Sequence, residues 1–371
     1  MSDLPSTMRS LVAPKFCDPS EYQVVDTPLP TIKKPNDVLI RVHAAAIQTG
    51  DTQRAKGATR ILPGKMQFPM KIGLEGSGVV VAIGTAVTKL KPGDEVYGVA
   101  LPGRPLDLFA EQGFASQYTV APEACVLLKP AALPHEDAAS LAGVTLIAYQ
   151  CAETGLRLLR ENGVMDGLKG KTVFVPGALS STGSAAIQLL KNYYGVGRMI
   201  STVSTEKLPQ VEQYLPGLVD QLIDYKTTKR LKDVIPAGSV DFVLNTQWDL
   251  IGTFALVDPK KGAVVSISSA PHPSLLREML PAAPRWLLWA LAVIQWYYAF
   301  RLRGTNIKYI FVSGDFGVRV DVERVGELIA TGKVKPVKRL VELEDIAAVR
   351  KGCKQVYTGK GGIGKLVIKI P

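Results

Sequence analysis

Residues 171–191, KTVFVPGALSSTGSAAIQLLK, decide the fold of this chain. The stretch begins with an apolar, β-branched run from Val173 to Val175. Small residues follow from Gly177 to Gly183, and helix-forming residues continue from Ala185. This order predicts a strand, a tight turn and a helix, which is the arrangement that holds the pyrophosphate of a dinucleotide. The free N–H groups of the helix's first turn and the helix dipole both favour an anion there.

The glycine pattern of this turn is incomplete. Gly177, Ser180 and Gly183 occupy the three slots of G-x-x-G-x-x-G, so a serine stands where the backbone would approach a phosphate. Serine is small, and its hydroxyl can donate to a phosphate oxygen. A strand-to-helix turn without a ligand remains the alternative at this point. The residues expected to bind a cofactor here are Gly177, Ser180, Ser181, Thr182 and Gly183.

Length and composition narrow the class of protein. A chain of 371 residues suits two domains, and 47% hydrophobic with 21% charged residues is typical of an ordered globular protein. The net charge of +11 can attract phosphate cofactors, acidic carrier proteins or anionic lipid. The sequence contains no basic run with interleaved aromatic residues, so we do not expect nucleic acid as a partner.

The cysteines and the amino terminus indicate the compartment. The four cysteines are far apart and form no C-x-x-C motif, which predicts reduced, buried thiols in a reducing environment. The first residues, MSDLPSTMRSLVAPKF, lack the apolar core of a signal peptide. We therefore expect a cytoplasmic protein, with peripheral attachment to an intracellular membrane as a further option.

The first part of the chain is rich in short strands. Residues 21–46 alternate between apolar and polar side chains, and further strands are expected at 72–84, 91–99 and 113–120. Glycine and proline separate these segments. This pattern predicts a β-rich, partly closed domain.

Four segments carry a family resemblance. They are AAIQTGDTQRAKG (45–57), PMKIGLEGSGVVVAIG (69–84), KPGDEVYG (91–98) and GFASQYTVAPE (113–123), and they precede the dinucleotide turn in this order. The chain resembles the medium-chain dehydrogenase/reductase superfamily, above all its zinc-free quinone oxidoreductase and enoyl reductase branch of fungal type. The resemblance implies an α/β protein. A GroES-like β-rich catalytic domain would comprise residues 1–140 and 315–371, and a Rossmann doubly wound parallel sheet would be inserted as residues 141–314.

The same resemblance argues against a metal. Zinc-dependent relatives have a cysteine where this chain has Gln48 and a histidine where it has Leu74, and neither residue here is a plausible zinc ligand. The four-cysteine lobe of those relatives is missing from residues 102–112, PGRPLDLFAEQ. We expect no metal site, and therefore no zinc-assisted alcohol oxidation.

The resemblance implies four catalytic positions. Gln48 and Asp51 stand at family positions, and Gln53 replaces a tyrosine or lysine found in many zinc-free members. An amide can hold a carbonyl but cannot donate a proton at neutral pH, so the proton donor stays open between a tyrosine elsewhere and bound water. Thr145 matches a small polar residue beside the nicotinamide, and its alternative is a helical threonine that bonds its own backbone.

The resemblance also indicates the choice of cofactor. Ser204 and Lys207 match a Ser-x-x-Lys of NADPH reductases, and Tyr225 matches a tyrosine beside the 2′-phosphate. A hydroxyl and an ammonium suit that phosphate, so we expect NADPH, although Glu206 leaves NADH as an alternative. The later strands are expected to end in further cofactor-binding residues, namely Asn245, Ser268, Phe311 and Val312.

An apolar insertion spans residues 281–303. From Trp286 to Phe300 its only polar side chain outside the aromatic residues is Gln295, and three of the four tryptophans lie there. Apolar residues on every face predict burial in protein, in lipid or against another subunit. Three alternatives remain open at this point: a substrate lid or subunit interface, a shallow membrane anchor, and a tilted membrane span.

These observations predict an NADPH-dependent, zinc-free reductase. It would pass hydride to the β-carbon of a conjugated carbonyl (an enone or enoyl group), or to a quinone, on a small apolar substrate. The first rival is a polyketide-associated enoyl reductase acting on a chain bound to an acyl carrier protein. The second is a membrane-associated interaction protein with little turnover. A homodimer and a membrane surface contacted through residues 286–300 are the other expected partners.

Overall fold

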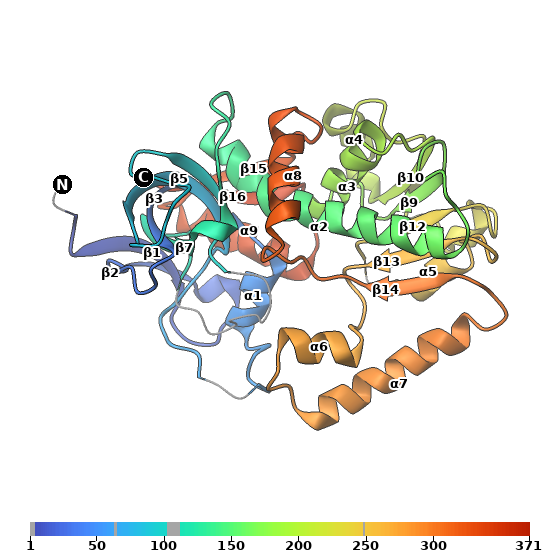
Figure 1. Ribbon diagram of the computed structural model, residues 1–371, viewed down its shortest axis with the longest axis horizontal. Helices are drawn as coiled ribbons and strands as arrows, with labels where there is room; N and C mark the ends of the chain where they lie inside the picture. The colour runs from blue at the N-terminus through green and yellow to red at the C-terminus, as the bar shows by residue number, and fades with distance from the viewer. Residues whose placement is uncertain (1–3, 63–64, 102–111, 248) are drawn as a thin grey trace. The chain divides into compact units, whose positions relative to one another are not determined.

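A computed structural model describes residues 4–62, 65–101, 112–247 and 249–371 (Figure 1). The chain divides into two compact units. The first comprises the residues up to Gly143, with 315–330 and 338–371, and the second comprises 144–314 and 331–337. Residues 331–337 thus return to the second unit, whereas the sequence pattern assigned everything after 314 to the first domain.

The first unit is built on two β-sheets. One has three antiparallel strands in the order β2-β1-β4, and the other has seven, in the order β15-β16-β3-β5-β6-β8 with β7 paired to β3. The strands are β1 (Thr7–Ala13), β2 (Gln23–Pro28), β3 (Asp37–Ile47), β4 (Met70–Lys71), β5 (Glu75–Ile83), β6 (Glu95–Val99), β7 (Tyr118–Pro122), β8 (Val126–Leu128), β15 (Lys338–Glu342) and β16 (Lys365–Lys369).

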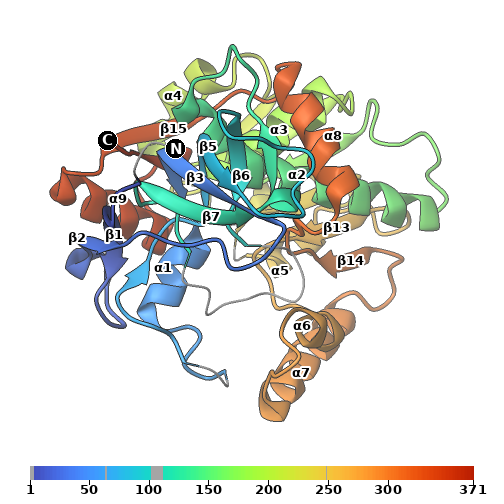
Figure 2. The same cartoon turned by 60° about the vertical axis from the view of Figure 1, so that its left-hand side comes forward.

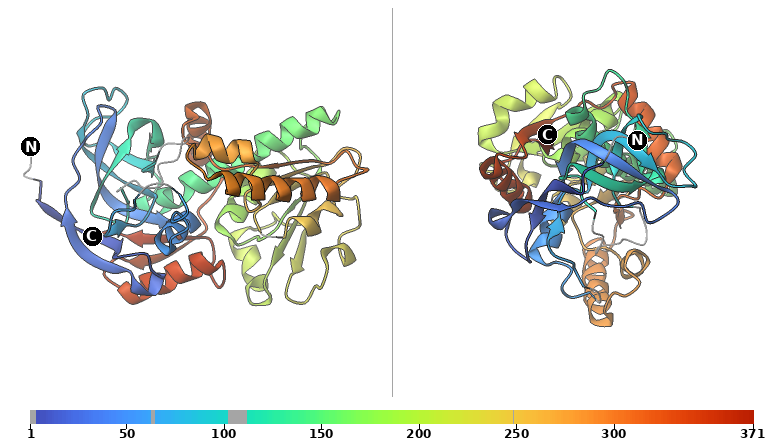
Figure 3. Two further views of the ribbon diagram at one scale, coloured as in Figure 1. Left: turned by 90° about the horizontal axis from the view of Figure 1, so that it is seen from below. Right: turned by 90° about the vertical axis from the view of Figure 1, so that its left-hand side faces the viewer.

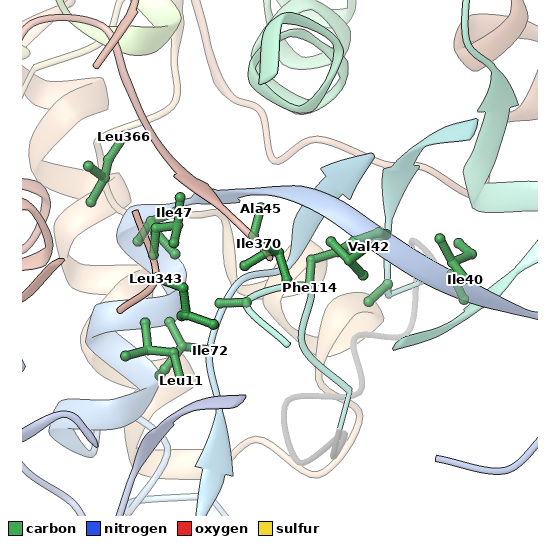
Figure 4. Close-up of a cluster of buried hydrophobic side chains, with 14 of the residues drawn as sticks. Leu11, Ile40, Val42, Ala45, Ile47, Ile72, Phe114, Leu343, Leu366 and Ile370 are labelled. Carbon is green, nitrogen blue, oxygen red and sulfur yellow. The ribbon is translucent and has the colours of Figure 1, made fainter. Parts of the chain in front are cut away.

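Strand β3 lies between the last strand of the chain and β5. Its register pairs Ile47 with Leu366 of β16 and Ala46 with Glu75 of β5. The end of β3 is therefore the place where residues from three distant parts of the sequence meet. Figure 4 shows the buried side chains beneath this region, contributed among others by Leu11, Ile47, Phe114 and Leu366.

Helices complete the first unit. They are α1 (Thr49–Lys56), α8 (Arg319–Ala330) and α9 (Ile346–Thr358), together with the 3₁₀ turns η1 (Pro19–Glu21) and η2 (Glu123–Cys125). Helix α2 (His135–Glu161) begins in the first unit and continues into the second.

The second unit contains a six-stranded parallel sheet in the order β11-β10-β9-β12-β13-β14. This is the strand order of a doubly wound dinucleotide fold, and it confirms the predicted α/β class with a parallel sheet. The buried run from Val173 to Val175 in β9 suits a strand covered on both faces. The strands are β9 (Thr172–Val175), β10 (Arg198–Val203), β11 (Gln221–Asp224), β12 (Phe242–Asn245), β13 (Ala263–Ser266) and β14 (Lys308–Phe311).

The helices of the second unit follow its strands. They are α3 (Ser181–Asn192), α4 (Leu208–Tyr214), α5 (Ile251–Phe254), α6 (Pro273–Met279) and α7 (Arg285–Arg301), with η3 (Thr205–Lys207) and η4 (Leu231–Asp233). Helices α6 and α7 pack against each other beyond the β14 edge of the sheet (Figures 2 and 3). In the part of the chain that the structure describes, no helix is long and apolar enough to cross a membrane, so the tilted-span alternative for α7 is wrong.

Some expected strands begin later than the sequence pattern suggested, and the strand expected at 72–84 begins at Glu75. The strand expected at 113–120 begins only at Tyr118, because Ala115 bonds instead to the backbone of Leu11 and Ile72. Helix α9 begins at Ile346, because the Asp345 side chain accepts the Ala348 N–H and caps the helix there.

Candidate functional site

A buried carboxylate is the centre of the polar cluster in the first unit. Glu75, at the start of β5, has 1% of its side chain exposed, and Lys365, at the start of β16, has 5%. Lys365 Nζ lies 2.5 Å from Glu75 Oε1, and Gln48 Nε2 donates to the same oxygen. The backbone N–H of Gly143 donates to Glu75 Oε2 over 3.0 Å. Both carboxylate oxygens are thus hydrogen-bonded, as a buried charge requires.

Gly143 is required for this approach. A Cβ placed on it would lie 2.5 Å from Glu75 Oε2. Helix α2 can therefore bring its backbone against the carboxylate only because residue 143 has no side chain.

The Asp51 carboxylate accepts hydrogen bonds from two backbone N–H groups next to the cluster. Its Oδ2 accepts the Gln48 N–H at 2.8 Å, and its Oδ1 accepts the Gly73 N–H at 3.1 Å. The first contact caps helix α1, and the second joins that helix to the loop before β5. Burial raises the pKa of Asp51 to about 6, against the effect of these hydrogen bonds. Asp51 therefore positions Gln48.

Gln53 does not join the cluster. It lies two residues after Asp51 on α1 and is exposed, whereas Asp51 is buried. Positions i and i+2 of a helix point in different directions. The structure thus brings Gln48 and Asp51 together and leaves Gln53 at the surface.

No cluster of three or more His, Cys, Asp or Glu side chains suited to a metal ion occurs in residues 4–62, 65–101, 112–247 and 249–371. All four cysteines are free and buried. The sequence argument about the missing cysteine lobe concerns residues 102–112, of which 102–111 lie outside the described residues.

The turn between β9 and α3 is a tight strand-to-helix junction that depends on glycine. Gly177 has φ +80° and donates its N–H to Thr202 Oγ1 at 3.0 Å. Ser180 is the N-cap of α3, and its hydroxyl oxygen accepts the Gly183 N–H at 3.0 Å, which leaves its proton free to donate. A Cβ on Gly183 would lie 2.2 Å from the Gly177 carbonyl oxygen, so this glycine allows the helix to pack on the turn. The helix begins at Ser181 and Thr182, whose N–H groups precede the first intrahelical bonds.

The cofactor residues predicted on the later strands gather at the same carboxyl edge. Asn245 ends β12, and its Nδ2 donates to Gln247 O at 2.7 Å and to Ser266 Oγ at 3.1 Å. Ser268 Oγ donates to Thr246 O at 2.9 Å. These side chains bind neighbouring loops and so hold the edge in shape. Phe311 and Val312 are half-buried there, and the Val312 N–H donates to Ser266 O at 2.9 Å.

The tip beyond β10 and β11 contains the residues expected at a 2′-phosphate. Ser204 follows β10 and is buried, Lys207 is half-buried, and Tyr225 follows β11 with 54% of its surface exposed. The Tyr225 N–H donates to Val203 O at 3.1 Å, so the two strand ends are adjacent.

Glu206, the residue that favoured NADH, forms an ion pair. Its carboxylate contacts the Lys226 ammonium, and this hydrogen bond lowers the pKa of Glu206 to about 2. Lys226 therefore opposes the negative charge that would repel a 2′-phosphate.

Thr145 is one of several buried residues whose side-chain polar atom has no hydrogen-bond partner among the described residues. The residue is fully buried in α2, and its Oγ1 forms no hydrogen bond with any part of the chain that the structure describes. The sequence left open that the Thr145 hydroxyl bonds to the backbone of its own helix, and no such hydrogen bond is present among the described residues.

Sequence reasoning did not identify Glu75, Lys365, Lys226 or Gln247 as site residues. For the first two a signal exists, because Glu75 is the one charged residue of β5 and Lys365 is followed in β16 by three apolar residues, and a charge beside such a run needs a partner. For Gln247, whose Nε2 would lie 2.7 Å from a Cβ on Gly177, the sequence holds no such signal.

Known proteins resemble the chain in sequence. Residues 34–131 match the alcohol dehydrogenase GroES-like domain. Mouse mitochondrial NAD(P)H oxidoreductase RTN4IP1 is 28% identical over 324 residues, which are 83% of this chain and 76% of the relative. The chloroplastic NADPH-dependent alkenal/one oxidoreductase of Arabidopsis thaliana is 33% identical over 248 residues, 66% of this chain and 58% of that protein.

Solved structures share the fold. The quinone oxidoreductase from Coxiella burnetii superposes with a TM-score of 0.73 at 21% identity and covers 98% of this chain and 100% of its own. Because the GroES-like match falls in the first unit, the parallel sheet of the second has the Rossmann order and the sequence relatives extend through both, the chain belongs to the medium-chain dehydrogenase/reductase superfamily.

Proposed function

We propose that this protein is an NADPH-dependent reductase that works without zinc. It transfers hydride to the β-carbon of a conjugated carbonyl, or to a quinone, on a small apolar substrate. This assigns it to the quinone oxidoreductase and enoyl reductase branch of the superfamily. The names of its relatives, an NAD(P)H oxidoreductase and an alkenal/one oxidoreductase, support a reductase that uses a nicotinamide cofactor.

The observation that carries the proposal is the carboxyl edge of the second unit's sheet. The turn at Gly177 and Gly183 admits a phosphate against the N-terminus of α3, and the pairing of Glu206 with Lys226 leaves the strand tip suited to a 2′-phosphate. NADPH, when bound, supplies the hydride.

The proposal excludes zinc because of the contacts of Gln48. Its amide donates to Glu75, and Lys365 supplies a positive charge to the same carboxylate. A cation from the chain itself thus neutralises Glu75, and an amide nitrogen that donates a hydrogen bond is not a zinc ligand. The residues of the first unit then contribute by binding and orienting the acceptor. Gln53 lies at the surface, and its amide cannot donate a proton at neutral pH, so water or another group supplies the proton.

The proposed function also implies partners and a location for the protein. We propose a small apolar substrate and a homodimer, with an acyl carrier protein as partner if the substrate is a carrier-bound enoyl chain. We propose a cytoplasmic location, with peripheral attachment to an intracellular membrane through residues 286–300.

A consumption assay tests the function. Purified full-length protein is given NADPH or NADH with a panel of enones, quinones and carrier-bound enoyl chains, while its zinc content is measured by elemental analysis after chelation. We expect NADPH oxidation with free enones or quinones, and no retained zinc. Turnover confined to carrier-bound chains would favour the polyketide enoyl reductase. Cofactor binding without turnover of any acceptor would favour the interaction protein, and about one retained zinc per chain would contradict the zinc-free assignment.

A further inference from the structure

Helix α7 has one face anchored to the second unit. Leu288 and Leu291 are buried, and they pack with Leu276 of α6. Gln295 Nε2 donates to Ala270 O over 2.7 Å. Further along, Tyr298 packs edge-on against Tyr309, with ring centroids 5.4 Å apart. Gln295, the only polar residue of the run from Trp286 to Phe300 outside its aromatic residues, is thus used on the inner face.

The opposite face of α7 is uncovered. Trp289 is 75% exposed and Trp296 is 68% exposed, although the sequence predicted that this segment would be covered. The rings of Trp296 and Phe300 stack at 5.9 Å. Spacings of three and four residues put the uncovered side chains on one helix face. This aromatic stripe consists of Trp286, Trp289, Val293, Trp296 and Phe300.

The charged residues of α7 and of the segment that follows it have one sign. No Asp or Glu occurs between Met279 and Gly314, whereas Arg285, Arg301, Arg303 and Lys308 do. The Arg303 guanidinium lies 5.8 Å from the centre of the Phe300 ring. Within the described residues, none of the three arginines forms an ion pair, so their charges are available to an outside partner.

We propose that α7 is an interfacial membrane helix that binds the surface of an anionic bilayer. The aromatic stripe enters the boundary between headgroups and acyl chains, and Arg285, Arg301 and Arg303 contact lipid phosphates. Tryptophan with an apolar body and a polar N–H suits this boundary, and arginine can extend its charge to the headgroups. With 17 residues α7 lies in the plane of the membrane. This inference rests on the membrane attachment proposed above, for which it names the lipid class and the contacting side chains, and it does not depend on the reductase activity.

The charges argue against a second copy of the chain as the occupant. If two α7 helices paired through their aromatic stripes, Arg285 of one would meet either Arg301 and Arg303 or Arg285 of the other. Like charges would meet in both orientations, and residues 279–314 contain no acid to compensate them. A surface of lipid phosphates complements the arginines at both ends of the helix.

Vesicle flotation tests the proposal on the full-length protein. We expect flotation with phosphatidylcholine vesicles that contain phosphatidylserine, and much less with phosphatidylcholine alone. Removal of each arginine should lower the partition coefficient about fivefold, so R285Q/R301Q/R303Q should lower it about a hundredfold. The matched control is K34Q/K91Q/K351Q, which removes the same charge from exposed positions of the first unit and should float like the unchanged protein. If both triple variants lost flotation equally, the net charge of the protein alone would explain the binding, and the proposal would be overturned.

The contribution of the aromatic stripe is tested by a second pair of variants. W289S/W296S should abolish flotation, whereas M165S, at a position 76% exposed elsewhere in the second unit, should not change it. A measurement on the unchanged protein needs no variant. Three of the four tryptophans lie on α7, so their emission should shift to shorter wavelength when anionic vesicles are added. Absence of both flotation and shift would overturn the proposal. A dimer seen by light scattering that W289S/W296S dissociates, without flotation, would assign the stripe to a second copy instead.

Discussion

Glu75 and Lys365 are 290 positions apart in the chain, yet their charged atoms lie 2.5 Å apart in the interior of the first unit. The pair links the start of β5 to the start of the last strand, on either side of β3. Gln48 and Gly143 donate to the same carboxylate, so four segments of the chain converge on one buried charge. The amide that replaces a zinc-ligating cysteine is held by this arrangement.

Replacing Lys365 should destabilise the first unit strongly. K365M leaves the Glu75 carboxylate buried without its cation, which costs about 3–5 kcal/mol of unfolding free energy. The double variant E75Q/K365M should recover most of the loss, because no charge is then buried unpaired. Urea unfolding measures both. K369M is the control on the same strand, since Lys369 pairs with Glu342 at 3.6 Å near the surface, and it should cost less than about 1 kcal/mol.

The stability of the protein should depend on the ionisation of Asp51. Its pKa is raised by burial from 3.8 to about 6, so the folded protein holds a proton that the unfolded chain has lost between these values. The unfolding free energy should therefore fall as the pH rises from about 4 to 6, by about 2–3 kcal/mol for this group. The pH profile of the unfolding free energy is measured for the unchanged protein and for D51N. The difference between the two profiles isolates the contribution of Asp51 from that of the other carboxyl groups. Parallel pH profiles for the two proteins would contradict the role of Asp51.

Lys207 should select NADPH over NADH. K207A removes a charge-assisted contact to the 2′-phosphate worth about 1.5–3 kcal/mol, which is more than tenfold in Kd for NADPH. The Kd for NADH should barely change, as titration calorimetry would show. Lys169 precedes β9 at the opposite edge of the sheet, so K169A should alter neither constant. Equal losses for both cofactors in K207A would mean that Lys207 does not contact the 2′-phosphate.

Lys226 should assist the same choice through Glu206. K226M would free the Glu206 carboxylate, which stays ionised at neutral pH because even the ordinary pKa of a glutamate, about 4.3, lies far below 7. Its charge should then weaken NADPH binding about two- to fivefold, without affecting NADH. The double variant E206Q/K226M should restore the NADPH affinity, and a failure to do so would assign the loss to Lys226 itself.

The sequence alone was sufficient for the Rossmann half of the fold. The strand, turn and helix from Lys171 to Lys191 have local patterns, because β-branched residues, positive-φ glycine and an N-capping serine each act within a few positions. The strand ends where Ser204, Tyr225 and Asn245 lie could also be found from hydrophobic runs. The helix at 285–301 was evident from its apolar composition, as was the absence of an ordinary solvent face.

Only the tertiary structure decided the contacts among residues far apart in the chain. The pairing of Glu75 with Lys365 depends on the register of β16 beside β3, and register reflects the packing of whole strands. The separation of Asp51 from Gln53 depends on which face of α1 meets the core. The aromatic stripe of α7 could not be predicted to be exposed, because a helix that is apolar all round does not specify which side its neighbours cover.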